Sequence, residues 1–148
     1  MTGELYLHPS LAAQVQDFKE NEVFKIKEIP YDYKTAFSEG DLLVTDYSSV
    51  AFDFAYLKKP VIYTQFDKKA FYQKHMWDPG FFKYKEHGFG PMPTTFDAAV
   101  KDITDIIEGD CVMPKKYKNR VEKFFYRFDK NNSARVYKAI VSMKKSDE

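Results

Sequence analysis

Short apolar runs alternate with stretches of helical spacing along the first 63 residues of the chain. The apolar runs predict four strands, at residues 4–7, 23–26, 42–44 and 61–63. The stretches between them predict helices over residues 10–18, 33–38 and 50–57, the first of them capped by Ser10. An alternation of strand and helix is typical of a parallel sheet with helices on both faces. The sequence therefore predicts an α/β fold with a Rossmann-like parallel sheet.

Residues 65–90 combine aromatic side chains with lysines and glycines and have no clear period. They predict a long, partly helical loop, and long loops inside compact domains are often functional. Its aromatic underside is expected to include Phe66, Phe71, Trp77, Phe81, Phe82 and Phe89. Residues 89–92 predict one further short strand.

Three helices are predicted in the C-terminal part of the chain. Thr94 and Asp97 form a capping-box pattern that opens a helix over residues 96–108. The apolar residues expected on one face of this helix are Phe96, Val100, Ile103 and Ile107. A second helix is expected to begin near Pro114. A third follows the break at residues 131–133, and residues 144–148 are expected to form a frayed tail.

The segment 41–54, DLLVTDYSSVAFDF, carries the most information about function. In it a buried strand passes into an apolar helix through a small polar turn made of Asp46, Tyr47, Ser48 and Ser49. Backbone N–H groups at a helix N-terminus favour an anion, above all phosphate. Ligands of parallel sheets bind at the carboxyl ends of the strands, where this 46–49 turn is expected. The pattern therefore predicts a phosphate site at the turn.

The composition is that of a soluble globular protein, with 148 residues, 44% of them hydrophobic and 30% charged. Such a length suits one domain. Cys111 is the only cysteine, so an internal disulfide is excluded and a reducing compartment is favoured. No apolar run approaches the roughly 20 residues of a membrane-spanning helix. Residues 1–10 also lack the basic start and the apolar stretch of a signal peptide.

The net charge of +1 hides an asymmetry along the chain. Residues 115–148 hold 11 Lys and Arg against 4 Asp and Glu, a balance of +7. Such an end either lies on an anionic lipid surface, attracts a polyanionic substrate, or is simply a solvated helix pair. The balance is too weak to predict a nucleic-acid partner.

Several site signatures are absent from the sequence. Neither GxGxxG nor GxxxxGK[ST] occurs, which argues against a dinucleotide dehydrogenase and a P-loop enzyme. GxSxG is absent too, which argues against a serine hydrolase. A zinc site is not expected, because His8, His75, His87 and Cys111 do not have metal-ligand spacing.

The string TDYSSVAFDFAYLKKPVIYTQFD, residues 45–67, closely resembles the CDP-glycerol glycerophosphotransferase family, whose members build the glycerol-phosphate polymers of wall teichoic acids and some capsules. Three further pieces resemble the same family in the same order. They are LHP at residues 7–9, GFGP at residues 88–91 followed by Thr94 and Thr95, and NSAR at residues 132–135. The resemblance covers nearly the whole chain.

The resemblance implies that residues 1–148 are one domain, the C-terminal donor-nucleotide lobe of a glycosyltransferase-B type fold. The family's other catalytic histidine lies in the N-terminal lobe, and no candidate for it precedes His8. The isolated chain is therefore expected to be inactive without that lobe. The resemblance implies no bound cofactor, CDP-glycerol or a related CDP-polyol such as CDP-ribitol as donor, and a glycerol-phosphate polymer as acceptor. It also implies a cytoplasmic protein, peripheral at the inner face of a bacterial plasma membrane.

His8 is, by this resemblance, the catalytic histidine of the lobe, which contacts the donor diphosphate and stabilises charge on the leaving CMP. On the sequence alone, a structural histidine that caps the next helix is the simpler interpretation. Pro30 and Tyr31 follow the second strand, where either the nucleotide base or an ordinary loop is expected.

Ser48 and Ser49 either hold the diphosphate with their hydroxyl and N–H groups or act only as helix N-caps. Asp46 is expected to face the glycerol hydroxyls or the opening of the helix, because a carboxylate beside phosphate is repulsive. Asp53 interrupts an apolar helix and is expected to have a partner, since a buried unpaired carboxylate is unfavourable.

Two other functions fit the same residues. A non-catalytic module would bind a polyanion or a partner protein with the basic C-terminal helices and the aromatic residues of 65–90. A nucleotide-sugar glycosyltransferase lobe of similar architecture would prefer UDP-sugars. Fold alone does not decide among them.

Overall fold

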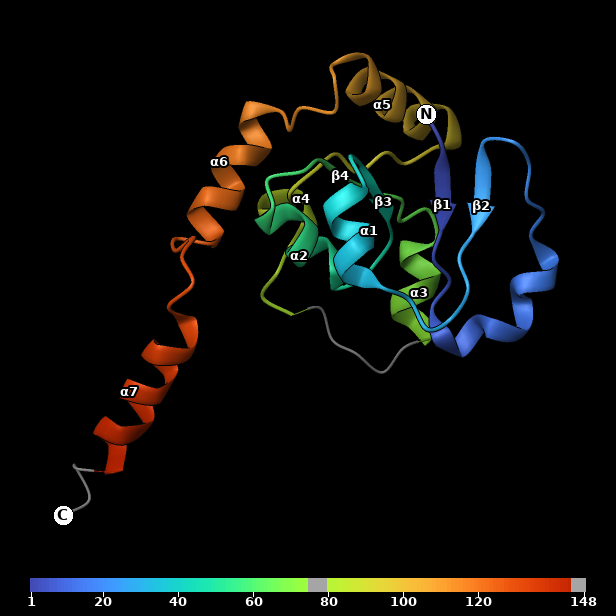
Figure 1. Cartoon of the computed structure of the whole chain (residues 1–148). Helices are drawn as coiled ribbons and strands as arrows, with labels where there is room; N and C mark the ends of the chain where they lie inside the picture. The colour runs from blue at the N-terminus through green and yellow to red at the C-terminus, as the bar shows by residue number, and fades with distance from the viewer. Residues whose placement is uncertain (75–79, 145–148) are drawn as a thin grey trace. The chain divides into compact units, whose positions relative to one another are not determined.

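The computed structural model describes residues 1–74 and 80–144 (Figure 1). The chain divides into two compact units, Met1–Gly40 and Asp41–Glu148, and each unit contains its own pair of parallel strands. That residues 1–148 form one donor-binding domain stays a prediction. Trp77 and His75, and the predicted tail beyond α7, lie outside the described residues.

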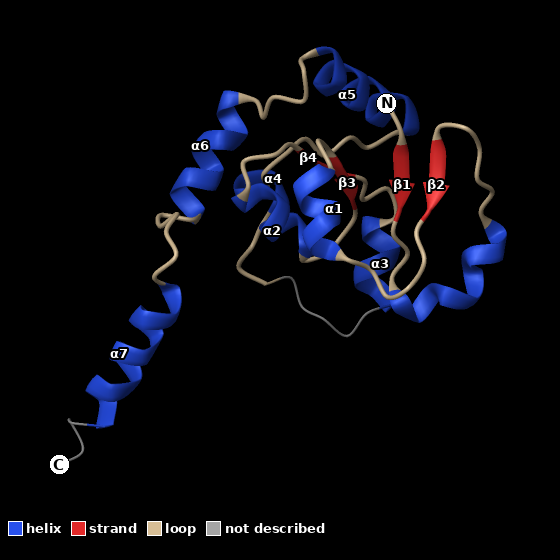
Figure 2. Cartoon of the chain, viewed as in Figure 1, coloured by secondary structure: helices blue, strands red, loops and turns tan. Residues whose placement is uncertain are grey.

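The first unit pairs β1 (Gly3–Leu5) with β2 (Phe24–Ile26), and the two arrows run in the same direction (Figure 2). Between them lies a 3₁₀ helix, η1 (Pro9–Asp17), and after them comes α1 (Tyr33–Glu39). Asp32 starts α1 because its carboxylate accepts from the N–H groups of Lys34 and Thr35, the usual work of an N-cap aspartate.

The prediction of an α-helix capped by Ser10 is wrong. His8 is the N-cap and Pro9 takes the first helical position, where proline is favoured because it lacks an N–H group. The apolar residues Leu11 and Val15 stay more than a third exposed, at 39% and 36%. A 3₁₀ helix has three residues per turn, so residues four apart do not share a face.

The second unit begins with a parallel strand–helix–strand unit, as the apolar runs predicted. It consists of β3 (Leu43–Thr45), α2 (Val50–Tyr56) and β4 (Val61–Tyr63), with Leu43 opposite Val61. The remaining helices are α3 (Lys68–Lys74), α4 (Tyr84–His87), α5 (Phe96–Glu108), α6 (Lys115–Phe124) and α7 (Asn132–Lys144). Every residue of β4 is buried, and α2 buries Ala51, Phe54 and Ala55.

Aromatic side chains fill the core beside α2, as the predicted aromatic underside requires. Phe89 is fully buried, and Phe82 packs between it and Phe52 at ring-centre distances of 5.5 and 4.7 Å. Phe124 of α6 joins them, 5.5 Å from Phe52 and 5.4 Å from Phe89. Phe81, by contrast, is 80% exposed, so only part of the predicted underside is buried.

The predicted strand at residues 89–92 is wrong, but this segment does lie along β4. The Tyr63 N–H group donates to the Pro91 carbonyl at 3.0 Å, and the Tyr63 hydroxyl accepts from the Phe89 N–H group at 3.4 Å. Pro91 has no N–H group with which to extend a ladder. The segment therefore packs against the strand without becoming one.

Helix α5 has the predicted bounds but a different cap and a different buried face. Thr95, not Thr94, is the N-cap, and its hydroxyl accepts from the Ala98 N–H group at 3.2 Å. The buried residues are Ala99 and Ile106, whereas Phe96 is 74% exposed. The face packed against the protein is thus rotated away from the predicted apolar stripe.

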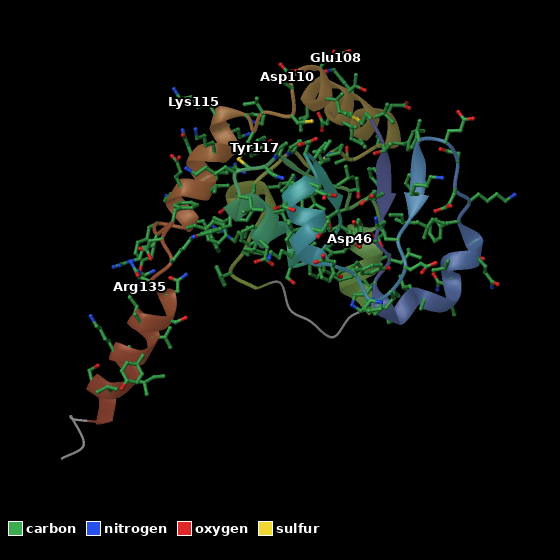
Figure 3. All side chains as sticks on the ribbon, in the orientation of Figure 1. Asp46, Glu108, Asp110, Lys115, Tyr117 and Arg135 are labelled. Carbon is green, nitrogen blue, oxygen red and sulfur yellow. The ribbon has the colours of Figure 1, made fainter. Side chains whose placement is uncertain are left out.

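Two arginines fix the C-terminal helices. The Arg120 guanidinium on α6 donates to the carbonyls of Gly88 and Lys85, at 2.8 and 2.9 Å. Arg135, labelled in Figure 3 at the start of α7, pairs with both carboxylate oxygens of Asp129 at 2.9 Å. Within the described ranges, no helix is both long enough and apolar enough to cross a bilayer.

Candidate functional site

The 46–49 turn joins β3 to α2, as predicted, and its polar side chains are exposed. Asp46 (labelled in Figure 3), Ser48 and Ser49 all face solvent. The Asp46 carboxylate accepts from the Ser48 N–H group at 3.3 Å, just before the N-cap of α2. The Ser48 hydroxyl accepts from Val50 N–H at the long distance of 3.5 Å. Ser49 occupies the N-cap position, but its hydroxyl makes no capping hydrogen bond.

Tyr47 is the turn's anchor. Its ring stacks on Phe71 of α3, with ring centres 3.7 Å apart and an interplanar angle of 11°. Its hydroxyl donates to Asp67 at 2.9 Å. Burial, and then the bond to Asp67, raise the pKa of the Tyr47 hydroxyl above its usual range. The side chain thus binds the turn to α3 rather than facing solvent like its neighbours.

The carbonyl groups of the turn accept hydrogen bonds from two side chains further along the chain. Gln65 Nε2 donates to the Asp46 carbonyl at 3.0 Å. The Tyr84 hydroxyl on α4 donates to the Tyr47 carbonyl at 3.4 Å. Sequence patterns did not reveal either residue, because both act through contacts that are not local in the chain.

His8, in the first unit, ends the segment that follows β1. Its Nδ1 accepts from the Ser10 N–H group at 3.2 Å and lies 2.7 Å from the Ser10 hydroxyl. The structural role of a helix-capping histidine is therefore confirmed. An imidazole that accepts at Nδ1 carries its proton on Nε2 when neutral, so the exposed ring also offers one hydrogen-bond donor.

Pro30 and Tyr31 line a hollow of about 290 Å³ within the first unit. The Tyr31 ring meets Tyr6 edge to face at 5.1 Å, and its hydroxyl oxygen is buried without a hydrogen-bond partner among the described residues. Acidic side chains dominate the rest of the lining, which also includes Glu4, Lys27, Glu28, Asp32, Thr35, Ala36 and Glu39. Hydrogen bonds from Thr35 lower the pKa of Asp32, which is committed to the start of α1.

A second, more open hollow of about 550 Å³ lies at the start of α6 and was not predicted. Its lining is Val112, Met113, Pro114, Lys115, Lys118, Asn119 and Glu122.

Asp53 is not buried, so the expectation of a buried, partnered carboxylate is wrong. The buried face of α2 is formed by Ala51, Phe54 and Ala55, which leaves Asp53 on the opposite side. Its place in the first turn suits a negative charge, because the helix dipole is positive there. Among the residues that the structure describes, no three His, Cys, Asp or Glu side chains form a group suited to a metal ion.

A family model described as CDP-glycerol:poly(glycerophosphate) glycerophosphotransferase matches residues 5–142. The chain belongs to this family. Its α/β, Rossmann-like fold is also that of the wall teichoic acid polymerase TagF. A variant of TagF superposes over 99% of the chain with a TM-score of 0.67 and 22% sequence identity, covering 35% of TagF.

Two relatives of this chain come from Bacillus subtilis (strain 168). The minor teichoic acid biosynthesis protein GgaB is 35% identical over 92% of this chain, and the teichoic acid poly(glycerol phosphate) polymerase is 31% identical over 74% of it. The matched regions cover only 15% and 14% of these relatives. The chain therefore corresponds to a small part of each of them.

The pieces of sequence that carry the glycerophosphotransferase resemblance have different structural roles. In residues 88–91, Gly90 lets the backbone pass against β4, and in residues 132–135 Arg135 pairs with Asp129. The 46–49 turn of the second unit and His8 of the first unit both present exposed polar groups. Each is a candidate binding position within its own unit.

Proposed function

We propose that this chain is the donor-binding part of an enzyme that transfers glycerol phosphate from CDP-glycerol to a growing teichoic acid or capsular polymer, releasing CMP. Family membership and the two Bacillus subtilis relatives support the reaction class. The observation that carries the proposal is the exposed 46–49 turn, whose Ser49 hydroxyl is not used for capping.

Ser48 and Ser49 hold the diphosphate in this proposal. Both side chains are exposed, and the Asp46 carboxylate accepts from the Ser48 N–H group. Hydrogen bonds from hydroxyl groups to a charged phosphate contribute about 1.5–3 kcal/mol each. Tyr47 contributes by anchoring the turn rather than by touching the ligand.

His8, in the first unit, offers its Nε2–H group to a phosphate of the donor in this proposal. The Ser10 N–H group occupies Nδ1 and so selects the tautomer whose Nε2–H group faces outward. A donor there stabilises the charge that develops on CMP as it leaves. Capping η1 and binding phosphate are therefore compatible roles of one ring.

The nucleotide base occupies the hollow beside Pro30 and Tyr31. A cytosine presents an exocyclic amino group, for which carboxylates are suitable acceptors, whereas uracil presents a carbonyl oxygen there. The carboxylates of Glu28 and Glu39 line the hollow and are exposed. This acidic lining supports a CDP donor over a UDP donor.

In the reaction, a hydroxyl oxygen of the acceptor attacks the phosphorus that bears glycerol, and the bond from that phosphorus to the CMP oxygen breaks. The acceptor proton leaves to a base from another part of the full enzyme. Positioning and charge stabilisation supply most of the acceleration, as in phosphoryl transfers generally. The chain length of the polyol is not determined by these contacts, so CDP-ribitol is the alternative donor.

Helix α7 supports a peripheral contact with an anionic membrane. Its exposed apolar residues Val136, Ile140 and Met143 are spaced as one helical face, and the segment from residue 115 onward is basic. Binding to vesicles with anionic lipid, lost at high salt or on replacing these three residues by serine, tests this contact.

Titration calorimetry with CDP-glycerol tests the donor site. We expect saturable binding that CMP and CDP compete for and that UDP-glucose does not. Replacing both Ser48 and Ser49 by alanine should weaken it more than tenfold while the thermal transition is unchanged. Unaltered affinity of that double variant would remove the turn from the site. Binding only to a polyanionic polymer, with strong salt dependence and indifference to nucleotide, would favour the non-catalytic module instead.

A further inference from the structure

Gln65 is a buried polar residue. It lies two residues after the end of β4, and only 7% of its surface is exposed. Its Nε2 donates to the Asp46 carbonyl at 3.0 Å. Its Oε1 is buried without a hydrogen-bond partner among the described residues.

A buried acceptor without a partner destabilises a fold, whereas a methionine of similar size would fill this position without that penalty. The bond from the amide group to the Asp46 carbonyl offsets this penalty at best in part, so its main effect is on the turn that it contacts. The amide group contacts the 46–49 turn, where the Asp46 carbonyl needs a hydrogen-bond donor. The Tyr84 hydroxyl adds a second bond, to the next carbonyl along, at 3.4 Å.

These two contacts orient the peptide groups of the turn. A trans peptide group is planar, and its N–H bond points opposite to its C=O bond. Gln65 therefore directs the N–H group of Tyr47 away from the core when it holds the Asp46 carbonyl. Tyr84 does the same for the Ser48 N–H group, which then meets the exposed Asp46 carboxylate.

We propose that Gln65 is a positioning residue for donor binding, which holds the 46–49 turn in its ligand-ready conformation, with Tyr84 as a second support. The inference rests on the proposed function of that turn. Gln65 acts through the Asp46 carbonyl and does not itself touch the donor.

Three variants test this role, measured on the whole chain. In Gln65→Met we expect amide hydrogen exchange at Tyr47, Ser48 and Ser49 to rise about tenfold and CDP-glycerol affinity to fall about tenfold, since one hydrogen bond is lost. Tyr84→Phe should give a smaller change in both. Gln14→Met, which replaces an exposed glutamine of η1, is the matched control and should change neither.

Gln65→Glu supplies a readout that a merely structural role would not move. A buried carboxyl group has a raised pKa, reaching about 8 in documented cases, and it can donate to the Asp46 carbonyl only when protonated. Affinity of this variant should therefore recover as the pH falls from about 8 to about 6. The recovery should be larger than any change in the affinity of the wild-type chain over the same pH range.

The outcomes separate the two proposals. Unchanged exchange at the turn in Gln65→Met, or pH-independent binding by Gln65→Glu, overturns the positioning role of Gln65. Absence of CDP-glycerol binding by the wild-type chain overturns the proposed function and, with it, a role of Gln65 in donor binding. If Gln65→Met fails to fold, the pH profile of Gln65→Glu decides.

Discussion

A Cβ atom added to Gly90 would lie 1.5 Å from the carbonyl oxygen of Val61. The backbone of residues 88–91 thus passes so close to β4 that only glycine fits. Fully buried Phe89 precedes this point, and the Pro91 carbonyl accepts from Tyr63 just beyond it. A glycine at residue 90 is therefore what lets this segment pack against the strand.

Replacing Gly90 by alanine should destabilise the protein by about 3 kcal/mol or more, because neither backbone can move without breaking the contacts of Phe89 and Pro91. Urea denaturation measures the change. Gly80→Ala is the control, since an added Cβ atom there meets nothing within 4 Å. A Gly90→Ala protein with the wild-type midpoint would contradict the packing described here.

Arg120 should not be replaceable by lysine. Its planar guanidinium donates to two carbonyls at once, at Gly88 and Lys85, and an ammonium group lacks that fork. We expect both Arg120→Lys and Arg120→Met to lower the free energy of unfolding by about 1–3 kcal/mol, since partly buried carbonyls lose their donors. Lys118→Met, an exposed change on the same helix, should have no effect. Stability of Arg120→Lys equal to the wild type would show that the fork is unimportant.

Two substitutions at His8 separate its roles. Asparagine also caps helices well, so His8→Asn should keep the Ser10 contact and the stability of the first unit, whereas His8→Ala should cost about 1 kcal/mol. Both variants lose the Nε2–H donor and should weaken CDP-glycerol binding alike. Calorimetry and thermal unfolding of the pair measure this. Normal binding by His8→Asn would limit His8 to capping.

High pH should destabilise the second unit. Burial raises the pKa of Tyr63, and of Tyr47 and Tyr84, above the ordinary value of 10.0. A raised pKa in the folded state means that the unfolded chain releases these protons first, so the stability is complete below pH 10 and falls as pH rises above about 10. Urea midpoints between pH 8 and pH 11 measure the loss. Tyr63→Phe should make the fall less steep, and an unchanged slope would contradict this source.

The local pattern of the sequence was enough to predict part of the fold and of the site. Short apolar runs around the 46–49 turn predicted β3, α2 and β4, because run length and turn chemistry are local properties. The buried faces of the helices and the hydrogen-bond partners of the side chains could not be predicted in this way. Asp53 and the buried face of α5 depend on which side of a helix meets the core, and this is decided by packing. The role of Gln65 was not predicted for a similar reason, because its partner Asp46 follows β3 whereas Gln65 follows β4.

The aromatic core beside α2 also has a consequence for synthesis. During translation Phe52 emerges from the ribosome first, Phe89 later and Phe124 last. In the native protein the three rings pack together. Until α6 has emerged, the nascent chain exposes the rings that Phe124 will cover. Translation through residue 124 is therefore needed before this cluster can close, and until then its aromatic rings stay exposed to chaperones.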